Sequence, residues 1–301
     1  MLNETCQPNW YSQLCFTTHK QLLKHLRDTK EYAGKRNTWV FRGQPADSKL
    51  QTTLERECEK SGIPLTKADH IERMTIRQFR RVYDREDRLD VLNDTLYCLS
   101  LLRHHGAPTR LLDFTYSQYV ALYFGLKDAY DSTKIRTQTV GFALWCIDAK
   151  DMNSKAEQRY SNDSSFLSAF KARAHISKRK DKPFQKLYLS NKYDLVVSEN
   201  PVRIHNRLHL QQGVHLCPGN VRKPFMENLR CLYGSGSTKS VRKLVCTLKM
   251  SDLEKAFQET MRMNITEESL FPGLDGQAHA MKYQMWFLNA LYDRIRKAGG
   301  S

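Results

Sequence analysis

Residues 140–148 read VGFALWCID and constrain the fold of this chain more than any other segment. The run is apolar almost throughout, whereas a strand with one face in solvent alternates apolar and polar residues. A strand of this composition has both faces covered, so we expect it in the interior of a sheet. Residues 117–130 (SQYVALYFGLKDAY) suit a buried helix that packs tightly against such a sheet. The two segments together predict a mixed α/β core.

Other segments extend this prediction. Strand patterns occur at 38–43, 193–199, 207–216 and 240–248, and helical patterns at 17–34, 67–82, 93–105, 251–263 and 277–298. We expect a single α/β (α+β) domain across residues 1–301, with a mixed sheet core and flanking helices. Its expected parts are a helical N-terminal segment 1–36, a basic insertion at about 150–192 interpreted as a loop, and a helical C-terminal segment at about 251–298. The terminal Gly-Gly-Ser is typical of a cloning remnant.

Targeting and metal-binding signals are missing from the sequence. No apolar run approaches the roughly 20 residues that span a bilayer, and the start, MLNETCQPNWYSQ, lacks the features of a signal peptide. We therefore expect a cytoplasmic protein with no membrane partner. The eight cysteines contain no Cys-x-x-Cys pair, which argues against a zinc ribbon or a thioredoxin-type site. His104 and His105 are adjacent and cannot form a helical H-x-x-x-H pair, so no metal site is expected.

The charge balance indicates a polyanionic partner. The chain carries 48 Lys and Arg against 32 Asp and Glu, a net charge of +16. Such an excess favours nucleic acid, because neutralised phosphates release condensed counterions. An indifferent basic surface, or an acidic protein partner that masks the charge, would give the same composition. The candidate nucleic-acid-binding residues are Arg77, Arg80, Arg81, Lys178, Arg179 and Lys180.

Two stretches concentrate the residues that carry chemistry. Residues 39–44 (WVFRGQ) place an arginine and a glycine after a strand-forming triplet. Arginine offers a fork of donors that matches a phosphate, and glycine lets a ligand approach the backbone, although an arginine that merely ends a strand would look the same. Residues 103–126 (RHHGAPTRLLDFTYSQYVALYFGL) gather polar groups between two regular elements. The structural alternative there is a buried Arg110–Asp113 ion pair, with Thr115 capping the next helix.

Five motifs then follow one another along the chain: WVFRGQ, HHGAPTRLLDFT at 104–115, GFALWCID at 141–148, RLHLQQGVH at 207–215 and LFPGLDG at 270–276. In this order they resemble the FRG domain family, whose core reads Q-H-Y-G-L-P-T-R-L-L-D-W-T followed by S-P and A-L-Y-F-A. The chain departs from that core at Arg103, His105, Ala107, Phe114, Gln118 and Gly125.

The arginine strand and the hydroxyl-rich turn also resemble the first two motifs of ADP-ribosyltransferases of the Arg-Ser-Glu class. The resemblance implies an ADP-ribosyltransferase-like fold with NAD as the cofactor. It implies that Arg42 holds the NAD pyrophosphate, that Gly43 meets the nicotinamide amide through its backbone, and that Thr115 and Ser117 replace the hydroxyl turn. The other expected cofactor-binding residues are Gln44, Thr109, Arg110 and Gln212.

The third motif of that class is a glutamate that bonds the ribose 2′-hydroxyl and, in some members, activates the acceptor. The matching segment carries Gln211 and Gln212, and the FRG pattern itself has R-x-x-x-Q. A glutamine can hold the ribose but cannot take a proton, so activation would fall to His104 or Asp113, with Glu199 as a substitute for the glutamate. Arg42, His104, Asp113 and Gln211 are therefore the candidate catalytic residues. A structural role for the two glutamines, and for a hydrogen-bonded His104, is the alternative.

The resemblance and the charge together predict an NAD-dependent mono-ADP-ribosyltransferase that modifies nucleic acid, RNA more than duplex DNA. In biological terms the resemblance suggests a toxin-like antiphage defence effector that an antitoxin or another inhibitory protein holds silent. The alternatives are a non-catalytic nucleic-acid-binding or sensing module, a protein-directed ADP-ribosyltransferase, and a nuclease in which Asp113 orients His104 as general base.

Overall fold

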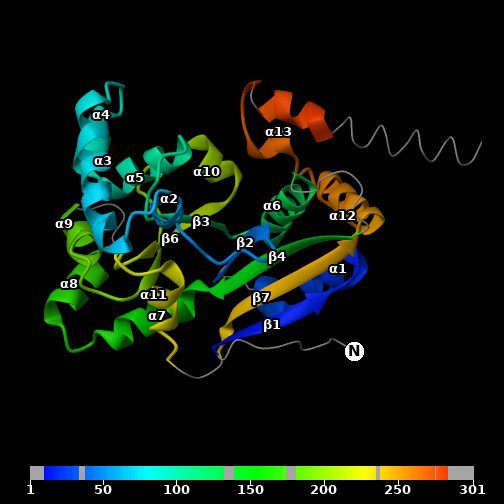
Figure 1. The fold of residues 1–301 in the computed structure, drawn as a ribbon, viewed down its shortest axis with the longest axis horizontal. Coiled ribbons are helices and arrows are strands. Elements are labelled where there is room, and N and C mark those ends of the chain that lie inside the picture. The colour runs from blue at the N-terminus through cyan, green and yellow to red at the C-terminus, as the bar shows by residue number, and fades with distance from the viewer. Residues whose placement is uncertain are drawn as a thin grey trace, which may run out of the picture.

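The computed structural model describes residues 10–33, 38–131, 139–173, 181–234, 238–274 and 276–283. A seven-stranded sheet in the order β1-β7-β4-β2-β3-β6-β5 runs through these residues (Figure 1). Its strands are β1 (Tyr11–Phe16), β2 (Trp39–Pro45), β3 (Leu112–Thr115), β4 (Thr139–Asp148), β5 (Val196–Glu199), β6 (Gly213–Pro218) and β7 (Thr238–Lys249). β1 and β7 pair in parallel and the other described neighbours pair antiparallel. The mixed α/β fold is thereby confirmed.

β4 lies inside the sheet, as its composition predicts, between β2 and β7. Its side chains alternate between two cores. Phe142, Leu144 and Cys146 pack on one face of the sheet. Trp145 and Ile147 pack on the other face. Because both faces are covered, apolar residues are favoured at every position, which explains the nearly continuous apolar run.

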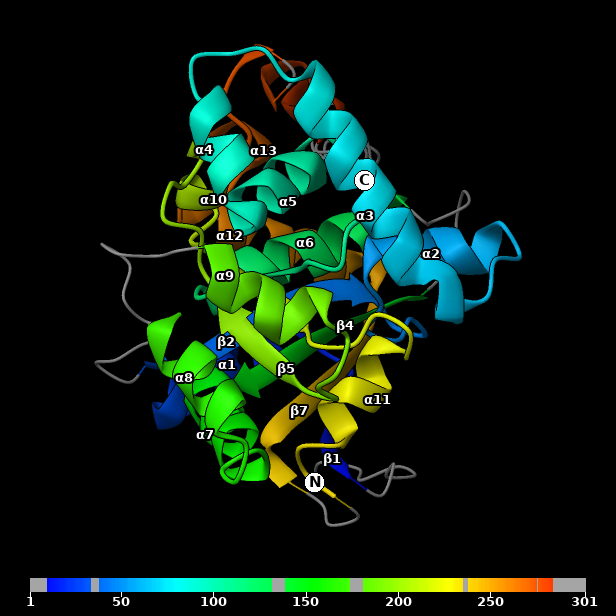
Figure 2. The same cartoon turned by 90° about the vertical axis from the view of Figure 1, so that its left-hand side faces the viewer.

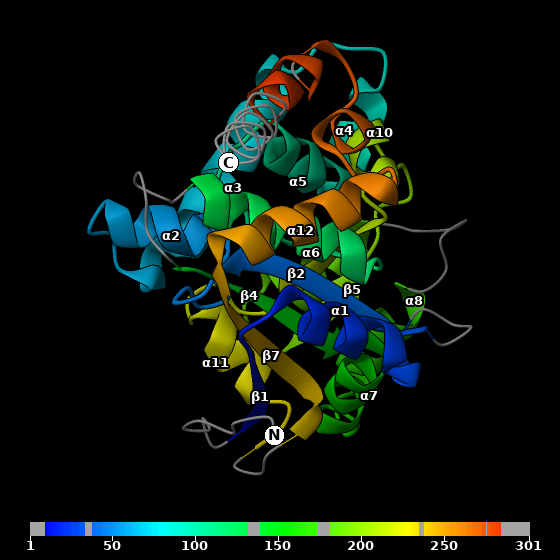
Figure 3. The same cartoon turned by 90° about the vertical axis from the view of Figure 1, so that its right-hand side faces the viewer.

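Helices α1 (His19–Asp28), α6 (Gln118–Asp131) and α12 (Met250–Arg262) cover one face of the sheet (Figure 3). The short helix α13 (Glu267–Leu270) follows α12 and is tied to α6. The buried Glu267 carboxylate accepts hydrogen bonds from Tyr123 Oη at 2.6 Å and from Lys127 Nζ at 2.7 Å. These contacts hold the end of α13 beside α6.

The other face is covered by α5 (Thr95–His104), α7 (Ala149–Arg159), α8 (Ser164–Ala172), α11 (Phe225–Arg230) and the π-helical turn Gln185–Leu189 (Figure 2). Further out lie α2 (Thr53–Lys60), α3 (Ala68–Val82), α4 (Arg88–Asn93), α9 (Asp181–Phe184) and α10 (Asn206–Leu210). Short 3₁₀ turns occur at Lys30–Ala33 and Leu65–Lys67. In the described parts of the chain, no helix combines the length and the apolar composition needed to cross a membrane.

Four expectations need correction or completion. The N-terminal segment 1–36 contributes the edge strand β1 as well as α1. The insertion at about 150–192 is mostly helical where described, in α7, α8 and α9. Of the strand expected at 207–216, only the part from Gly213 is extended, because α10 precedes it. The expected helix at 277–298 is helical as far as residue 283, and its remainder, like the Gly-Gly-Ser end, lies outside the described residues.

Candidate functional site

Two adjoining cavities lie over β2 and β3. The larger, of about 210 Å³, is lined from β2, α5, β3, α6 and α10, and the smaller, of about 140 Å³, continues between α5, α10 and β6. Both are lined by Arg103, Asp113, Phe114, Arg207 and Gln211, so we treat them as one cleft. In Figure 1 the elements that line it are α5 and α10 on one side and α6 on the other. A larger hollow of about 560 Å³ between α2 and α11 contains none of the candidate residues.

Arg42 lies on β2 and lines the larger cavity. Its Nε donates to Gln44 Oε1 at 3.2 Å, and its Nη1 donates to the Asp113 carbonyl at 2.8 Å. Burial lowers the pKa of Arg42 to about 10, although Asp113 opposes this shift, so the guanidinium stays charged at neutral pH. Nη2 has no hydrogen-bond partner among the described residues. This nitrogen is therefore available to a ligand.

Gln44 does not line the cleft, contrary to its expected cofactor-binding role. Its side chain is buried, its Nε2 donates to the Ser48 carbonyl at 2.8 Å, and its Oε1 accepts from Arg42. Gln44 therefore fixes the orientation of Arg42 instead of contacting a ligand.

Gly43 lines the larger cavity, but its lack of a side chain serves the packing of α6. A Cβ at this position would lie 2.0 Å from the Ala121 carbonyl oxygen and 2.3 Å from the Gly125 nitrogen. Both are backbone atoms of α6, so no other residue fits without moving the helix. The close approach that the sequence indicated is thus made by a helix and not by a ligand.

Asp113 of β3 joins the two cavities. Its Oδ2 lies 2.8 Å from Arg103 Nη2, and its Oδ1 lies 3.1 Å from His215 Nδ1. Burial alone would raise the pKa of Asp113, but the hydrogen bond from His215 and the charges of Arg103 and Arg42 outweigh it and hold the pKa well below its usual range. Asp113 is therefore ionised. It does not pair with Arg110, and it orients His215 instead of the His104 that the nuclease hypothesis requires.

A hydrogen-bond chain continues from Asp113 through His215 to Ser100. The Ser100 Oγ lies 2.9 Å from His215 Nε2. In many hydrolases an aspartate and a histidine, connected by the same series of contacts, activate a serine hydroxyl as the nucleophile. Ser100 lines the smaller cavity but has no exposed surface within α5, so in this structure its hydroxyl is closed to a substrate. We conclude that the chain fixes His215 and, through it, the Asp113 carboxylate.

Arg110 is remote from the cleft and bonds to protein. Its side chain has no exposed surface, and its Nε donates to the Glu72 carboxylate of α3 at 2.9 Å. Its Nη1 donates to the carbonyls of Tyr188 at 2.8 Å and Pro218 at 3.2 Å. The neighbouring Thr109 is also fully buried, and its backbone nitrogen donates to Thr53 Oγ1 at 3.0 Å. The expected cofactor-binding role is therefore corrected to a structural one for both residues.

The hydroxyl-rich turn is mostly engaged in local bonds. Thr115 lines the larger cavity, but its Oγ1 donates to the Gln211 carbonyl at 2.7 Å and accepts from the Ser117 nitrogen at 3.0 Å. The Ser117 Oγ accepts from the Val120 nitrogen at 3.3 Å, so Ser117 caps α6, the role that the structural alternative gave to Thr115. The turn joins β3 to the α10–β6 connection.

Arg207 and Gln211 lie four residues apart at α10, and both line the two cavities. The Gln211 Nε2 donates to the Leu270 carbonyl at 3.2 Å. Gln212 has a positive φ of 47°, is exposed and does not line the cleft. Glu199 is also outside it: the carboxylate is buried, accepts from Tyr188 Oη and lies 3.5 Å from Arg173 Nη1. No described glutamate lines either cavity.

His104 and His205 lie side by side in the wall of the smaller cavity, which His215 also lines. The rings of His104 and His205 lie 4.4 Å apart between centroids. Burial lowers the pKa of both, to about 4 for His205, and the charge of Arg207 acts in the same direction. Both rings are therefore neutral at pH 7. The His104 Nδ1 is buried without a hydrogen-bond partner among the described residues, which native structures rarely leave at a buried polar atom.

The cleft is rich in arginine. Arg42, Arg103 and Arg207 line it, and Asp113 and Asp128 are the carboxylates among its described lining residues. The Arg103 Nε is buried without a hydrogen-bond partner. Within the described residues Arg207 forms no ion pair, and its guanidinium stacks 4.5 Å from the centroid of the Phe271 ring. This excess of positive charge suits an anionic ligand such as a pyrophosphate.

The basic residues of α3 do not share one role. Arg80 donates to the Val91 carbonyl and to Thr95 Oγ1, both at 3.0 Å, and thereby holds α3 against its neighbours instead of facing solvent. Arg77 and Arg81 are exposed and, with Arg80, line a separate groove of about 390 Å³. The other candidate nucleic-acid-binding residues, Lys178, Arg179 and Lys180, lie outside the described residues.

Sequence reasoning missed several residues of the cleft: Ser100, Arg103, Asp128, His205, Arg207 and His215. One signal was present for Arg207. The Arg-x-x-x-Gln spacing of 207–211 places both side chains on the same face of a helix. The others come together only through tertiary contacts between α5, α6 and β6.

Comparisons with known proteins give one finding. Neither the curated proteins nor the solved structures provided a significant match. Residues 37–134, which include β2, β3 and α6, match the family model of the FRG domain, so the sequence supports the FRG family over this segment.

Proposed function

We propose that the protein is an NAD-dependent mono-ADP-ribosyltransferase whose substrate NAD binds in the cleft at Arg42. One observation carries the proposal. Arg42 lies on β2, the hydroxyl turn follows β3 and Gln211 precedes β6, and these three strands are neighbours in the sheet. Arg42, Thr115 and Gln211 line the same cavity. In the proposal these residues, which are distant in the sequence, take the places of the three motifs of the Arg-Ser-Glu class.

The residues of the cleft fit such a ligand in charge and in unused polar atoms. Three arginines line it, and Arg42 Nη2 and Arg103 Nε have no hydrogen-bond partner among the described residues. Arginine forks bind phosphate oxygens bidentately. Ligand pockets usually measure about 300 to 1,000 Å³. At about 210 and 140 Å³ the two cavities suit the nicotinamide ribose and a phosphate better than a whole dinucleotide.

NAD supplies an ADP-ribosyl group whose bond to nicotinamide can be broken. Arg42, held in place by Gln44 and the Asp113 carbonyl, would bind the pyrophosphate. The Gln211 amide would hydrogen-bond the ribose hydroxyls but cannot take a proton. Asp113 keeps a fixed negative charge, and such a charge stabilises the positive charge that develops on the ribose during transfer.

The proposed acceptor is nucleic acid, RNA more than duplex DNA. It is supported by the net charge of +16 and by the exposed Arg77 and Arg81. The proposed biological role is that of a toxin-like antiphage effector in the cytoplasm, held silent by an acidic antitoxin or another inhibitory protein. A protein acceptor is one outcome of the experiment below.

A specific observation favours a second candidate, the non-catalytic nucleic-acid-binding module. No described glutamate lines the cleft, whereas three arginines do. In such a module Arg42 would grip a nucleic-acid phosphate directly. The two candidates differ in cofactor use, because only the transferase releases nicotinamide.

The test is incubation of the purified protein with NAD labelled on the adenylate phosphate, together with total RNA, DNA fragments or cell lysate. The account predicts label on RNA with equimolar release of nicotinamide, and loss of both in Arg42→Ala. Arg27→Ala is the matched control, because this arginine of α1 is exposed and does not line the cleft. No label on any pool and no free nicotinamide, together with salt-sensitive RNA binding, would support the binding module instead.

A further inference from the structure

The carboxylates of the cleft face the same cavity from different elements. Asp113 reaches it from β3 and Asp128 from α6, and both line the larger cavity with Arg42. A transfer reaction with no glutamate in the cleft needs another group to take the proton of the acceptor. These two aspartates are the candidates among the residues that line the cavity of Arg42, since His104 and His205 line only the smaller cavity.

Asp113 is unsuited to that task because both of its oxygens are engaged. One contacts Arg103 and the other contacts His215, which is itself fixed by Ser100. The same contacts hold the pKa of Asp113 well below its usual range. A carboxylate that stays ionised under these conditions is a weak base and a permanent local charge.

Asp128 has the opposite surroundings. It is half-buried, and no described residue donates a hydrogen bond to it or forms an ion pair with it. Burial raises the pKa of Asp128, and the charges of Arg42 and Lys127 only partly oppose this. The charged groups that face it are Arg42 on β2, Arg56 on α2, and Lys127 and Asp131 on α6, with Arg103, Asp113 and Arg207 in the same cavity.

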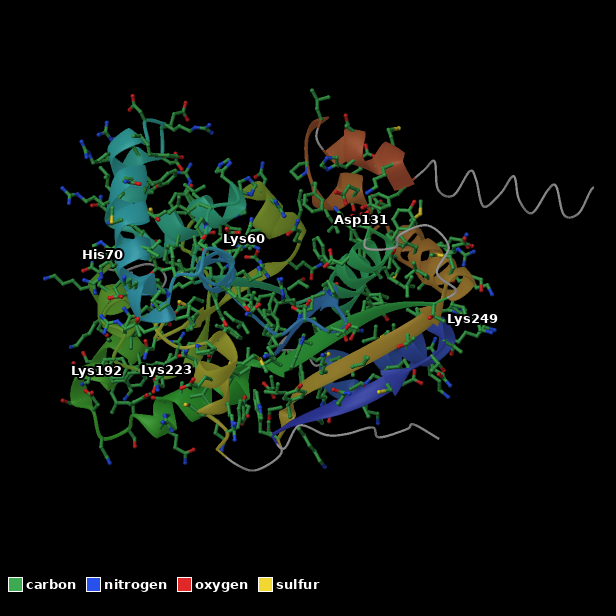
Figure 4. All side chains as sticks on the ribbon, viewed as in Figure 1. Lys60, His70, Asp131, Lys192, Lys223 and Lys249 are labelled. Carbon is green, nitrogen blue, oxygen red and sulfur yellow. The ribbon has the colours of Figure 1, made fainter. Side chains whose placement is uncertain are left out.

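Its neighbour Asp131 shows what a structural carboxylate on α6 looks like. Figure 4 labels Asp131 at the C-terminal end of this helix. Its Oδ1 lies 2.6 Å from Lys282 Nζ, and its Oδ2 accepts from Tyr283 Oη at 3.2 Å. Asp131 does not line the cleft. The two aspartates, three residues apart, therefore differ in partners and in access to the cavity.

We propose that Asp128 is the general base of the transfer, accepting the proton of the acceptor hydroxyl or amine. The inference rests on the proposed transferase function. In the step, an acceptor oxygen or nitrogen forms a bond to the anomeric carbon of the ribose as the bond from that carbon to nicotinamide breaks. The electron pair of the broken bond leaves with nicotinamide, and the acceptor proton passes to the Asp128 carboxylate and then to water.

The experiment compares Asp128→Asn with Asp131→Asn in two readouts: binding of NAD by calorimetry, and the pH dependence of label transfer to RNA. The expected result for Asp128→Asn is unchanged NAD affinity, a rate about 100-fold below that of the unaltered protein, and loss of the decline in rate at acid pH. Formate should restore part of the rate to Asp128→Ala, because it supplies the missing carboxylate. Asp131→Asn should keep both affinity and pH profile.

Two results would overturn the assignment and leave the transferase function intact. One is transfer by Asp128→Asn at the original rate with an unchanged acid decline. The other is a loss of NAD affinity in Asp128→Asn that accounts for the whole loss of rate, since this would make Asp128 a binding residue. Failure of the unaltered protein to bind NAD would instead refute the proposed function itself, and the assignment with it.

Discussion

Arg42 lies on β2 and Arg110 lies two residues before β3, and their guanidinium groups have different surroundings. Arg110 has no exposed surface, and its three guanidinium nitrogens donate to Glu72, Tyr188 and Pro218. Arg42 is half-buried and donates from two nitrogens, to Gln44 and to the Asp113 carbonyl, while its Nη2 has no hydrogen-bond partner among the described residues.

The difference teaches how a ligand-binding arginine can be told from a structural one. Each arginine carries five N–H donors, and a fully buried guanidinium must satisfy them with protein groups. An arginine that is positioned by a few of these bonds and keeps the rest toward a cavity is prepared to bind an anion. By this criterion Arg42 belongs to a site and Arg110 to the core.

The largest loss of stability should come from breaking the buried ion pair between Arg110 and Glu72. Arg110→Ala leaves the Glu72 charge buried without a partner, which costs about 3 to 5 kcal/mol of unfolding free energy. Arg42→Ala should cost clearly less, because its side chain is half-buried and faces a cavity. Urea denaturation followed by circular dichroism measures both. Equal losses of unfolding free energy in Arg110→Ala and Arg42→Ala would contradict the assignment of Arg110 to the core and of Arg42 to the site.

A second prediction concerns Gly43, the neighbour of Arg42 on β2, and its packing against helix α6. Gly43→Ala forces a Cβ against the α6 backbone and should destabilise the fold by about 1 to 3 kcal/mol through overpacking. NAD affinity should fall as well, because α6 and β2 both line the cavity. Gly62→Ala is a useful control for glycine loss, since a Cβ there meets nothing within 4 Å, although its positive φ adds some strain. A Gly43→Ala protein of unchanged stability would contradict the packing role.

A smaller loss of stability is expected from a change in the hydrogen-bond chain that runs from Asp113 through His215 to Ser100. Ser100→Ala removes one buried hydrogen bond to His215 and should cost about 1 kcal/mol. Label transfer should persist, since Ser100 is too buried to be a nucleophile. Complete loss of activity in a folded Ser100→Ala protein would instead indicate hydrolase-like chemistry at this residue.

The smallest expected effect is a change in how the stability of the protein depends on pH. The pKa of His205 is about 4 when folded, against 6.5 when unfolded, so the unfolded chain binds more protons between these values. The contribution of His205 to the free energy of unfolding is fully present above about pH 6.5 and is lost as the pH falls toward 4. His205→Asn should flatten this decline, because asparagine can still cap α10 at the Leu208 nitrogen without titrating. Melting temperatures at pH 7 and pH 5 test it, and an equal decline in both proteins would refute it.

Long, strongly patterned elements could be predicted from the sequence. The apolar residues are numerous enough in β4, β7, α5 and α6 to predict whether each element is a helix or a strand and which of its residues are buried. Short elements could not. α10 has five residues, and its Leu208 and Leu210 alternate as they would in a strand, so no helical period is visible. β1 is a half-buried edge strand without a marked pattern.

The site could be predicted only in part, for a related reason. Arg42, Gly43, Asp113, Thr115, His104 and Gln211 could be nominated from motifs, and all line the cleft. Whether a nominated residue is used by the core depends on partners distant in the sequence. Glu72 lies 38 positions before Arg110, and His215 lies 102 positions after Asp113. Nothing in one sequence identifies such partners.

The most direct test of the central claim is titration of NAD into the purified protein and into Arg42→Ala by calorimetry, with Arg27→Ala as the matched control. The account predicts binding by the unaltered protein and by Arg27→Ala, and at least a tenfold weaker affinity in Arg42→Ala, about 1.4 kcal/mol or more. Equal affinity in Arg42→Ala, or no binding of NAD by the unaltered protein, would contradict the claim that the cleft at Arg42 is an NAD site.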